Sequence, residues 1–275
     1  MKLVTWNVNS IKARLPRLLE LLDEHRPDVA CLQETKCSRE AFPHAELAAA
    51  GYACADHSGG RWAGVAVLGR TGQPPTDVAV GLPATPAAGE QVDDCRWVEA
   101  TVGGMRVASV YVPNGRAVGT ETFAQKLRFL DAMANRVATL ADRAGGGRRR
   151  SRRRWEGLPL VVAGDMNVAP DDRDVYDPEA FVGSTHVTPD ERGRLQRILD
   201  AGMVDAYRQR HPDEVCFTWW DYRAGHFHRN LGLRIDLVLL SADLAPRLDS
   251  CGIARDYRKG TKPSDHAPLV ATLSA

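Results

Sequence analysis

Near the middle of the chain, an acid and an amide directly follow a short apolar segment. Residues 158–163 read LPLVVA, and Gly164, Asp165, Met166 and Asn167 come next. A short apolar run that stops at a glycine predicts a strand buried on both faces. A carboxylate and an amide two residues apart at its carboxyl end can point into one crevice, where α/β proteins place polar chemistry. The alternative is a strand-to-turn cap, in which Asp165 and Asn167 bond their own backbone.

Polar side chains end or follow several other predicted strands in the same way. The apolar segments are KLVTW, VACLQ, ASVYV, LVVAG, LRID and PLVATL, the last of which is preceded by its polar pair. The polar residues at these positions are Asn7, Glu34, Tyr111, Asp165, Asn167, Asp236, Asp265 and His266. Carboxylates gathered in a low-dielectric cleft repel one another, so such a rim is stable mainly when a divalent cation lies in it. Oxygen ligands and retained water favour Mg²⁺.

Each of these residues also has a purely structural interpretation. Asn7 could be a turn residue after a strand, and Tyr111 could be a strand-end aromatic with its hydroxyl in water. His266 could be a turn histidine whose hydrogen bonds are satisfied. Asp236 could form a surface ion pair with Arg234, although the apolar LVLL that follows it favours burial. Convergence of these side chains at one place would favour catalysis over all of these alternatives.

The length and composition are those of one globular domain. The chain has 275 residues, 44% hydrophobic and 26% charged, which suits a single domain (1–275) with a large core. No apolar run approaches the ~20 residues of a membrane span, and the chain starts directly in an apolar strand. We therefore expect no membrane partner and no signal peptide. Six cysteines without a C-x-x-C pair favour reduced thiols in the cytoplasm over a zinc cluster or disulfides.

The net charge of +1 hides an uneven distribution. Six arginines lie between Arg148 and Arg154, and without them the chain holds 30 basic and 35 acidic residues, a net charge of −5. Glycines beside these arginines predict a flexible, solvated loop at 143–156. The functional alternative is an arm that binds phosphates and adds salt-dependent, sequence-independent affinity for DNA. The sequence favours neither interpretation over the other.

Strands outnumber helices in the predicted order of elements. Helices are expected at 11–22, 39–50 and 121–141 and near 190–201, and a Pro/Gly-rich surface excursion at 72–91. Adjacent strand pairs and strand–helix–strand units both occur. The predicted fold class is therefore α/β, with two mixed sheets packed face to face and helices outside.

Seven segments of the chain resemble, in the same order, the motifs of the exonuclease III family. They are TWNVNSI (5–11), LQETKC (32–37), YVPNG (111–115), GDMNVAP (164–170), TWWDYR (218–223), GLRIDL (232–237) and KPSDHAP (262–268). This family contains bacterial relatives of abasic-site endonucleases, within the deoxyribonuclease I-like endonuclease/exonuclease/phosphatase superfamily. A single short motif would be weak, whereas seven in order are specific.

The resemblance implies a four-layer α/β sandwich and a phosphodiesterase that depends on Mg²⁺, with Mn²⁺ as a substitute. It implies cleavage of double-stranded DNA 5′ to abasic sites, with 3′-to-5′ exonuclease and 3′-phosphatase trimming of blocked 3′ ends. A cytoplasmic monomer that acts in base excision repair is expected. The alternatives are a small-molecule phosphoesterase of the same superfamily and a catalytically silent DNA-binding homologue. WWDYR and GLRID argue against the first, and retention of the acids, amides and histidine argues against the second.

The same resemblance implies roles for the residues at the strand ends. Glu34 would be the principal metal ligand with Asn7 and Asp265 close by, and Asp165 would orient or deprotonate the attacking water. The remaining implied roles concern the phosphate: Asn167 would help to position it and the water, Asp236 would hold His266, and Tyr111 would face the phosphate or the leaving oxygen. Asp165, Asn167 and His266 also belong to the implied metal set. Whether Asp165 is base, ligand or both stays open, as does the choice of one metal or two.

The resemblance also implies contacts to the substrate. Trp219 would line the pocket for a sugar that lacks its base, with Leu233 or Ile235 completing an apolar wall, while Trp220 packs in the core. The groups expected to touch DNA phosphates are Lys36, Asn114 and Arg116. One departure is Ala63, where many relatives carry asparagine, so one polar contact near the site is expected to be missing.

Overall fold

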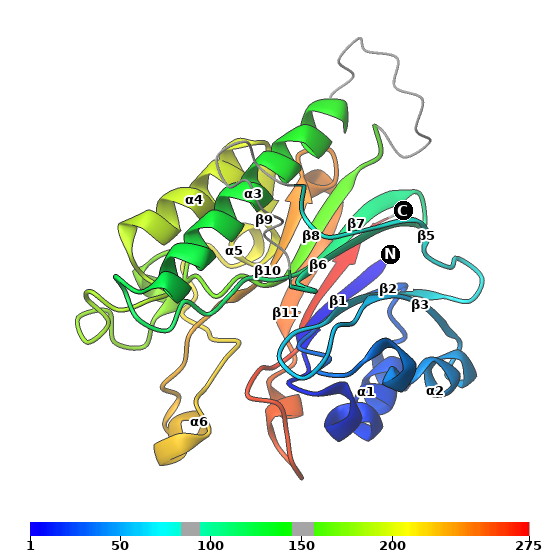
Figure 1. Ribbon diagram of the computed structural model, residues 1–275, viewed down its shortest axis with the longest axis horizontal. Helices are drawn as coiled ribbons and strands as arrows, with labels where there is room; N and C mark the ends of the chain where they lie inside the picture. The colour runs from blue at the N-terminus through cyan, green and yellow to red at the C-terminus, as the bar shows by residue number, and fades with distance from the viewer. Residues whose placement is uncertain (84–93, 145–156, 275) are drawn as a thin grey trace.

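Two six-stranded sheets lie face to face in the computed structural model, which describes residues 1–83, 94–144 and 157–274 (Figure 1). The first sheet has the order β11-β12-β1-β2-β4-β3, and the second has the order β5-β6-β7-β8-β10-β9. The strands of the first sheet are β1 Lys2–Asn7, β2 Val29–Gln33, β3 Tyr52–His57, β4 Val65–Arg70, β11 Leu248–Ile253 and β12 Leu269–Leu273. Those of the second are β5 Thr76–Val80, β6 Trp97–Val102, β7 Met105–Tyr111, β8 Leu160–Asp165, β9 Met203–Asp205 and β10 Asp236–Ser241.

Helices cover the outer faces of the two sheets. They are α1 Ile11–His25, α2 His44–Ala49, α3 Glu121–Ala144, α4 Pro189–Asp200, α5 Ala206–Arg210 and α6 His226–Arg229. In Figure 1, α1 and α2 lie outside the first sheet, and α3 and α4 lie outside the second. The predicted sandwich of two mixed sheets with outer helices is confirmed. None of the helices in the described part of the chain has both the length and the apolar character of a membrane span.

Apolar side chains fill the three spaces between these four layers. Between the sheets, Val29 and Val67 pack against Val107, Val161 and Val238. A second cluster joins α3 to the outer face of the second sheet through Phe129, Leu130, Met133 and Val137. A third joins α1 to the first sheet through Leu18, Leu21 and Leu22. The central strands of both sheets are therefore covered on both faces, as their continuous apolar sequences predict.

Strand direction brings the polar ends together at one edge of the sandwich. β1 and β2 run parallel, and so do β7 and β8, with Tyr111 opposite Asp165. β10 runs antiparallel to β8 and places Asp236 opposite Asp165. Because an antiparallel strand begins where its neighbour ends, the start of β10 shares this edge with the ends of β1, β2, β7 and β8.

Three sequence expectations differ from the structure. Asp236 begins β10 and does not end a strand, because Leu233 forms isolated bridges to Val175 and Trp219 outside the sheet. The helix expected at 39–50 is divided by Pro43 into a 3₁₀ turn, Arg39–Ala41, and α2. The surface excursion at 72–91 contains β5, whose mostly exposed side chains give no apolar alternation. Residues 145–156, which hold the arginine run, lie outside the described residues.

Candidate active site

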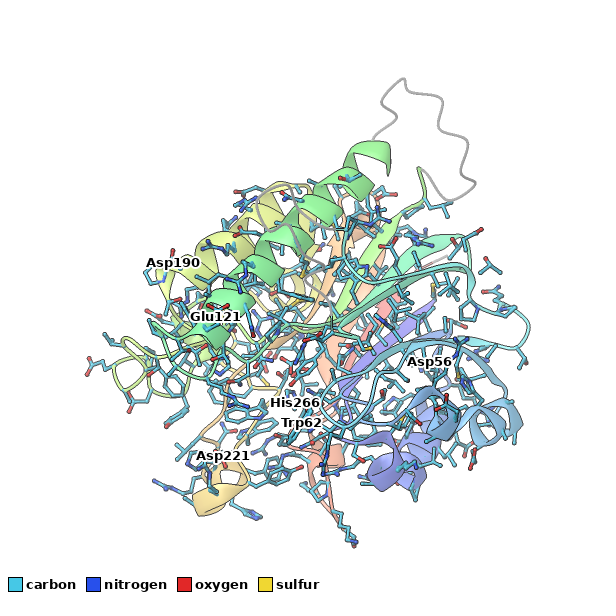
Figure 2. The ribbon with its side chains drawn as sticks, in the orientation of Figure 1. Asp56, Trp62, Glu121, Asp190, Asp221 and His266 are labelled. Carbon is cyan, nitrogen blue, oxygen red and sulfur yellow. The ribbon has the colours of Figure 1, made fainter. Side chains whose placement is uncertain are left out.

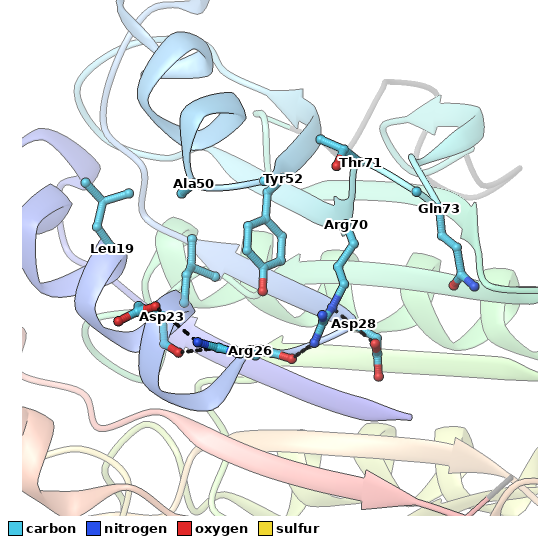
Figure 3. Close-up of a pocket in the computed structure, with 12 residues that line it drawn as sticks. Leu19, Asp23, Arg26, Asp28, Ala50, Tyr52, Arg70, Thr71 and Gln73 are labelled. Carbon is cyan, nitrogen blue, oxygen red and sulfur yellow. Dashed lines mark hydrogen bonds and ion pairs between the residues drawn. The ribbon is translucent and has the colours of Figure 1, made fainter.

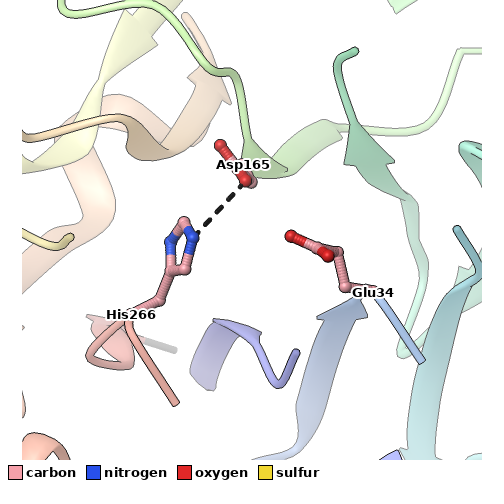
Figure 4. Close-up of side chains that lie close together, drawn as sticks. All are labelled: Glu34, Asp165 and His266. Carbon is pink, nitrogen blue, oxygen red and sulfur yellow. Dashed lines mark ion pairs between the residues drawn. The ribbon is translucent and has the colours of Figure 1, made fainter. Parts of the chain in front are cut away.

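Three ionisable side chains converge at this edge (Figure 4). Glu34, Asp165 and His266 each offer one ligand atom, and these atoms all lie within 4.8 Å of one another. Glu34 follows β2, Asp165 ends β8, and His266 lies in the segment before β12. His266 Nε2 is 3.7 Å from Asp165 Oδ2. Segments distant in sequence therefore form one cluster with two carboxylates and an imidazole.

Asn7, at the end of β1, joins the two carboxylates of this cluster. Its Nδ2 donates to Glu34 Oε1 at 2.7 Å and to Asp165 Oδ2 at 2.9 Å. Its Oδ1 accepts the backbone N–H of Asn9 at 3.0 Å. The side chain is fully buried. In this orientation Asn7 reduces the repulsion between Glu34 and Asp165 as a donor, and its oxygen faces away from the cluster.

The cluster has the character of a site for a hard divalent cation. The pKa of Asp165 is raised to about 7. Burial and the nearby negative charges of Asp236 and Glu34 raise it, and together they outweigh the positive charge of His266, which lowers it. A buried carboxyl group with neighbouring acids is stabilised in its charged form by a cation. Carboxylate oxygens are the donors that Mg²⁺ prefers. The donors of Glu34 and Asp165 therefore fit this ion.

His266 is held on its other side by Asp236. His266 Nδ1 lies 2.8 Å from Asp236 Oδ2, and both residues are buried. Burial alone would lower the pKa of His266, but the charges of Asp236 and Asp165 raise it to about 10. The imidazole is therefore protonated, with both ring nitrogens acting as donors. The alternative surface pair between Asp236 and Arg234 is wrong, because the guanidinium of Arg234 pairs with Asp174 and Asp205.

Asp265 lies next to the three-residue cluster but is held by other partners. Its Oδ1 accepts from Asn9 Nδ2 at 2.9 Å, and its Oδ2 accepts from Trp219 Nε1 at 3.1 Å. Burial raises the pKa of Asp265, but the charge of His266 and these two donors outweigh burial and lower it. Asp265 is thus ionised with both oxygens engaged.

Asn9 also links this region to the predicted DNA contact Lys36. Lys36 Nζ donates to Asn9 Oδ1 at 2.6 Å and pairs with Glu34 Oε2 at 2.6 Å. Asn9, Glu34 and Lys36 all have positive φ, as does Asn167. Backbone in this region is strained for residues other than glycine and clusters at functional sites. Asn9 was not among the predicted site residues; its position two residues after Asn7 is the signal in the sequence that could have indicated it.

A second polar group surrounds Asn167. Its backbone N–H donates to Asp165 Oδ1 at 2.9 Å, and its Nδ2 donates to the carbonyl of Val112 at 2.9 Å. Its Oδ1 accepts from Asn114 Nδ2 at 3.3 Å. His186 Nδ1 lies 2.6 Å from the carbonyl of Asn167. Burial, with the charge of Lys126, lowers the pKa of His186 to about 4, so this imidazole is neutral.

Tyr111 lies buried beside Glu34 and Asp165. Burial, with the charge of Glu34, raises the pKa of its hydroxyl well above the usual range, so the hydroxyl stays protonated. The guanidinium carbon of Arg96 lies 4.4 Å from the centre of the Tyr111 ring. Sequence reasoning identified neither Arg96 nor His186, since no motif marks them and only the fold brings them to the site.

The predicted substrate contacts lie around the cluster. Trp219 is partly buried and forms backbone bridges with Leu233 and His266. Leu233 and Ile235 pack in one buried apolar cluster with Trp219 against it, so they form no open wall of a pocket, and the expected contact of Leu233 with substrate is not seen. Trp220 is fully buried, as predicted. Arg116 and Asn114 are exposed, and the backbone N–H of Arg116 donates to Asn114 Oδ1 at 3.1 Å.

The segment around Ala63 lies directly against Glu34. Thr35 N donates to the carbonyl of Gly64 at 3.1 Å, and Lys36 N donates to that of Ala63 at 2.9 Å. The neighbouring Trp62 is 73% exposed, whereas His266 is buried; both are labelled in Figure 2. An exposed tryptophan beside a polar site was not predicted from the sequence.

A cavity of about 600 Å³ lies at the other end of β2 from Glu34 (Figure 3). Leu19, Tyr52 and the polar residues Arg26, Asp28 and Arg70 line it. Arg70 Nε pairs with Asp28 Oδ1 at 3.2 Å, and Tyr52 donates to the carbonyl of Pro27 at 2.8 Å. These polar groups of the cavity lining are bonded to one another and to the backbone. The carboxylate cluster at the other end of β2 is therefore the better candidate for chemistry.

Comparisons with known proteins show to which family the chain belongs. Residues 4–266 match the model of the Endonuclease/Exonuclease/phosphatase family. Exodeoxyribonuclease III of Haemophilus influenzae is 33% identical over 98% of this chain and 99% of its own length. A 3′ phosphatase, NExo, from Neisseria, solved with a product DNA hairpin, is 38% identical with a TM-score of 0.89, and the match covers 100% of both chains. An AP endonuclease from Archaeoglobus fulgidus is 34% identical with a TM-score of 0.88, again over 100% of both chains. The chain belongs to the endonuclease/exonuclease/phosphatase family, and within it to the exonuclease III group.

Proposed function

We propose that this protein is a DNA-repair phosphodiesterase that cleaves double-stranded DNA 5′ to abasic sites and trims blocked 3′ ends. The observation that carries the proposal is the convergence of Glu34, Asp165 and His266 within 4.8 Å at one edge of the sandwich. The names of the relatives, which include an exodeoxyribonuclease, a 3′ phosphatase and an AP endonuclease, support DNA as substrate. The protein acts as a cytoplasmic monomer in this proposal.

Mg²⁺, or Mn²⁺ in its place, would be held by Glu34 and Asp165, with Asn7 and Asp265 fixing the surroundings. When bound, the cation withdraws charge from the non-bridging oxygens of the phosphate. His266 is assigned to the phosphate and not to the metal, because a protonated imidazole has no free lone pair. Asn167 is likewise assigned a positioning role, since both ends of its amide are bonded to Asn114 and Val112.

Asp165 is the residue that takes a proton from the attacking water. A general base works best when its pKa lies near the operating pH. Burial raises the pKa of Asp165 to about 7 in the cation-free site, above that of an ordinary aspartate, and a cation bound to the carboxylate would lower this pKa. The backbone N–H of Asn167 holds Asp165 Oδ1 at 2.9 Å, which leaves the orientation of the carboxylate fixed. Asp165 therefore combines the position and the proton affinity that hydrolysis requires.

His266 and Tyr111 stabilise the phosphate as charge builds up on it. The protonated His266 donates through Nε2, while Asp236 maintains its charge through Nδ1. Tyr111 stays protonated and donates to the phosphate or to the leaving oxygen. Donors fixed before the reaction lower the barrier because they need not reorganise.

The partly exposed ring of Trp219 accepts a sugar that lacks its base, and the buried side chains of Leu233 and Ile235 support this ring from the core. A pocket of this kind excludes an intact nucleotide by its size. The exposed Arg116 binds the DNA backbone, where such contacts set position and not sequence. Lys36 is bonded to Glu34 and Asn9 beside the cation site, and its ammonium group contacts a DNA phosphate there.

The test is cleavage of a 5′-labelled duplex that contains one tetrahydrofuran site, beside an undamaged duplex and one with a 3′-phosphate. We expect incision 5′ to the tetrahydrofuran site and release of the 3′-phosphate, both lost with EDTA and restored by Mg²⁺. A soluble inositol phosphate serves as the small-molecule control. Hydrolysis of this compound without cleavage of any duplex would move the substrate to small phosphoesters, and binding of DNA without cleavage would leave only a DNA-binding homologue.

A further inference from the structure

A fully buried ammonium group lies behind the asparagines of the site. Lys126 belongs to α3, and its side chain has no exposed surface. Its Nζ donates to the carbonyl of Asn167 at 2.6 Å, to the carbonyl of Asn114 at 3.2 Å and to Thr185 Oγ1 at 3.0 Å. It also forms an ion pair with Glu191 of α4. One cation therefore contacts three separate loops.

Glu191 fixes the third of these loops from the other helix. Its Oε1 accepts from Thr185 Oγ1 at 2.9 Å and from the backbone N–H of His186 at 2.9 Å. Its Oε2 accepts from the hydroxyl of Thr188 at 2.6 Å and from the backbone N–H of the same residue at 3.0 Å. The start of α4 and the loop that carries His186 are thus tied to the carboxylate that neutralises Lys126.

The loop around Gly115 is shaped to admit this lysine. A Cβ atom at Gly115 would lie 2.8 Å from Lys126 Cδ, and the residue has a φ of +85°. Only glycine adopts that backbone without strain and leaves room for the lysine. The glycine of the PNG motif, which the proposed function leaves without a role, thereby brings the carbonyl of Asn114 within reach of the ammonium.

We propose that the buried Lys126–Glu191 pair is a positioning device that sets the side chains of Asn114, Asn167 and His186 for the hydrolysis proposed above. The inference rests on that proposed function. Lys126 and Glu191 touch no reacting atom, but they fix the backbone from which these three side chains project. The backbone N–H of Asn167 in turn holds Asp165.

Helix packing alone does not account for this pair. α3 and α4 are already joined by Asp131, whose carboxylate accepts from Arg194 and Arg197 at 3.1 and 2.6 Å. Well-packed apolar side chains are often as stable as a buried ion pair, because two charges must lose their water. What apolar residues cannot supply is a donor for the carbonyls of Asn114 and Asn167.

The test separates positioning from stability by neutralising both partners. Lys126→Met leaves Glu191 as an unpaired buried charge and is expected to lower both Tm and kcat. The double variant Lys126→Met/Glu191→Gln restores part of the Tm, because no buried charge is then unpaired, although one backbone N–H and two carbonyls lose their partners. We expect its kcat on the tetrahydrofuran duplex to stay about 10- to 100-fold below wild type with an unchanged KM, the size of loss that follows a misplaced site. Asp131→Asn, which cuts an ion pair between the same helices, should keep wild-type kcat.

Recovery of kcat together with Tm in the double variant would overturn the inference. If that variant does not fold, Thr185→Val decides, since it keeps both charges and the shape of the side chain. A severalfold lower kcat at near wild-type Tm supports positioning, and an unchanged kcat overturns it. Mn²⁺ affinity, measured by electron paramagnetic resonance, should stay at the wild-type value in each folded variant. An inactive wild type would overturn the proposed function and this inference with it, whereas an active wild type with an equally active double variant overturns the inference alone.

Discussion

Asp236 Oδ2 lies 2.8 Å from His266 Nδ1, and this contact joins the first residue of β10 to the segment before β12. Thr218 Oγ1 accepts the backbone N–H groups of Ile235 and Asp236, each at 3.1 Å, and so fixes the start of the strand. Asp236 Oδ1 has no hydrogen-bond partner among the described residues. The full charge of the carboxylate is therefore directed at the imidazole, which is why His266 stays protonated although it is buried.

Replacement of Asp236 by asparagine should move the alkaline limb of the pH–rate profile. The pKa of His266 is raised to about 10, so its protonated form is present below that pH and is lost above it. Without the carboxylate, burial lowers the pKa, and we expect the alkaline limb to shift to lower pH. At pH 8 the rate should fall by about 100-fold or more, the usual contribution of a positioned acid. Asp249→Asn, at an exposed position, is the control; an unshifted limb in Asp236→Asn would contradict this role for His266.

Replacement of Asp165 by asparagine should stabilise the metal-free protein at pH 8 and abolish cleavage. The pKa of Asp165 is raised to about 7, so its charged form is disfavoured in the folded state. Its contribution to stability is therefore greatest below about pH 4, the unfolded pKa, and falls as pH rises towards 7. At pH 8 in EDTA we expect Asp165→Asn to raise Tm, by about 2–4 °C for each kcal/mol relieved.

Scanning calorimetry with and without Mg²⁺ provides the measurement. Mg²⁺ should raise the Tm of the wild type, because binding to the folded state alone stabilises it, and should raise that of Asp165→Asn less. A lower Tm for the variant in EDTA at pH 8 would mean that the carboxylate is not under electrostatic strain. Nicking by the variant at a near wild-type rate would remove Asp165 from the chemistry.

Much of the candidate site follows from the sequence because its residues stand at strand ends. Asn7, Glu34 and Asp165 each follow or end an apolar run, and parallel strands bring such ends to one edge. Asp236 was expected to hold His266 and lies 2.8 Å from it, although the sequence suggested a strand that ends at Asp236 and not one that begins there. At a given edge of a sheet, a parallel neighbour of β8 ends, whereas an antiparallel neighbour begins. The sequence alone does not reveal the direction of a strand, so it could not show that β10 begins at Asp236.

Residues whose place depends on tertiary contacts were missed. His186 reaches the site from a loop and Lys126 from the second turn of α3, where neither the apolar pattern nor a motif indicates their partners. The strand β5 was missed for a related reason. Its side chains are mostly exposed and show no alternation, and only its pairing with β6 makes it a strand.

Glu34 should control the metal requirement. It pairs with Lys36 and accepts from Asn7, so Glu34→Gln removes the charge with little change of shape. We expect the Mg²⁺ concentration for half-maximal activity to rise by at least about tenfold. Loss of a residue that only hydrogen-bonds to a metal ligand already lowers metal affinity by about this factor, and loss of the ligand itself should lower it at least as much. Isothermal titration with Mn²⁺ measures the affinity without turnover. Glu40→Gln, on an exposed turn outside the cluster, is the matched control, and equal Mn²⁺ affinity in Glu34→Gln would exclude Glu34 as a principal ligand.

Trp62 should stack on DNA. Its ring is 73% exposed, the guanidinium carbon of Arg61 lies 5.5 Å from its centre, and its loop is bonded to the backbone after Glu34. Stacking on an unpaired base contributes about 1–3 kcal/mol, so Trp62→Ala should weaken binding of a duplex that exposes an unpaired base by that amount and leave kcat at saturation unchanged. Quenching of tryptophan fluorescence by DNA should be smaller in Trp62→Phe than in the wild type. Equal affinities of Trp62→Ala and the control Val80→Ala would place Trp62 outside the DNA contact.

The arginine run at 148–154 should set the salt dependence of DNA binding if it acts as a phosphate-binding arm. Each phosphate neutralised by a lysine or arginine contributes about −0.9 to the slope of log affinity against log salt concentration on duplex DNA. Deletion of 145–154 should therefore flatten this slope and leave turnover nearly intact, since this segment contains none of the residues to which the chemistry is assigned. A variant with six serines in place of the arginines keeps the chain length and should behave as the deletion does. If both variants retain the wild-type slope, the run is a solvated segment with no part in binding, and the affinity must come from the groups around Glu34 and Arg116.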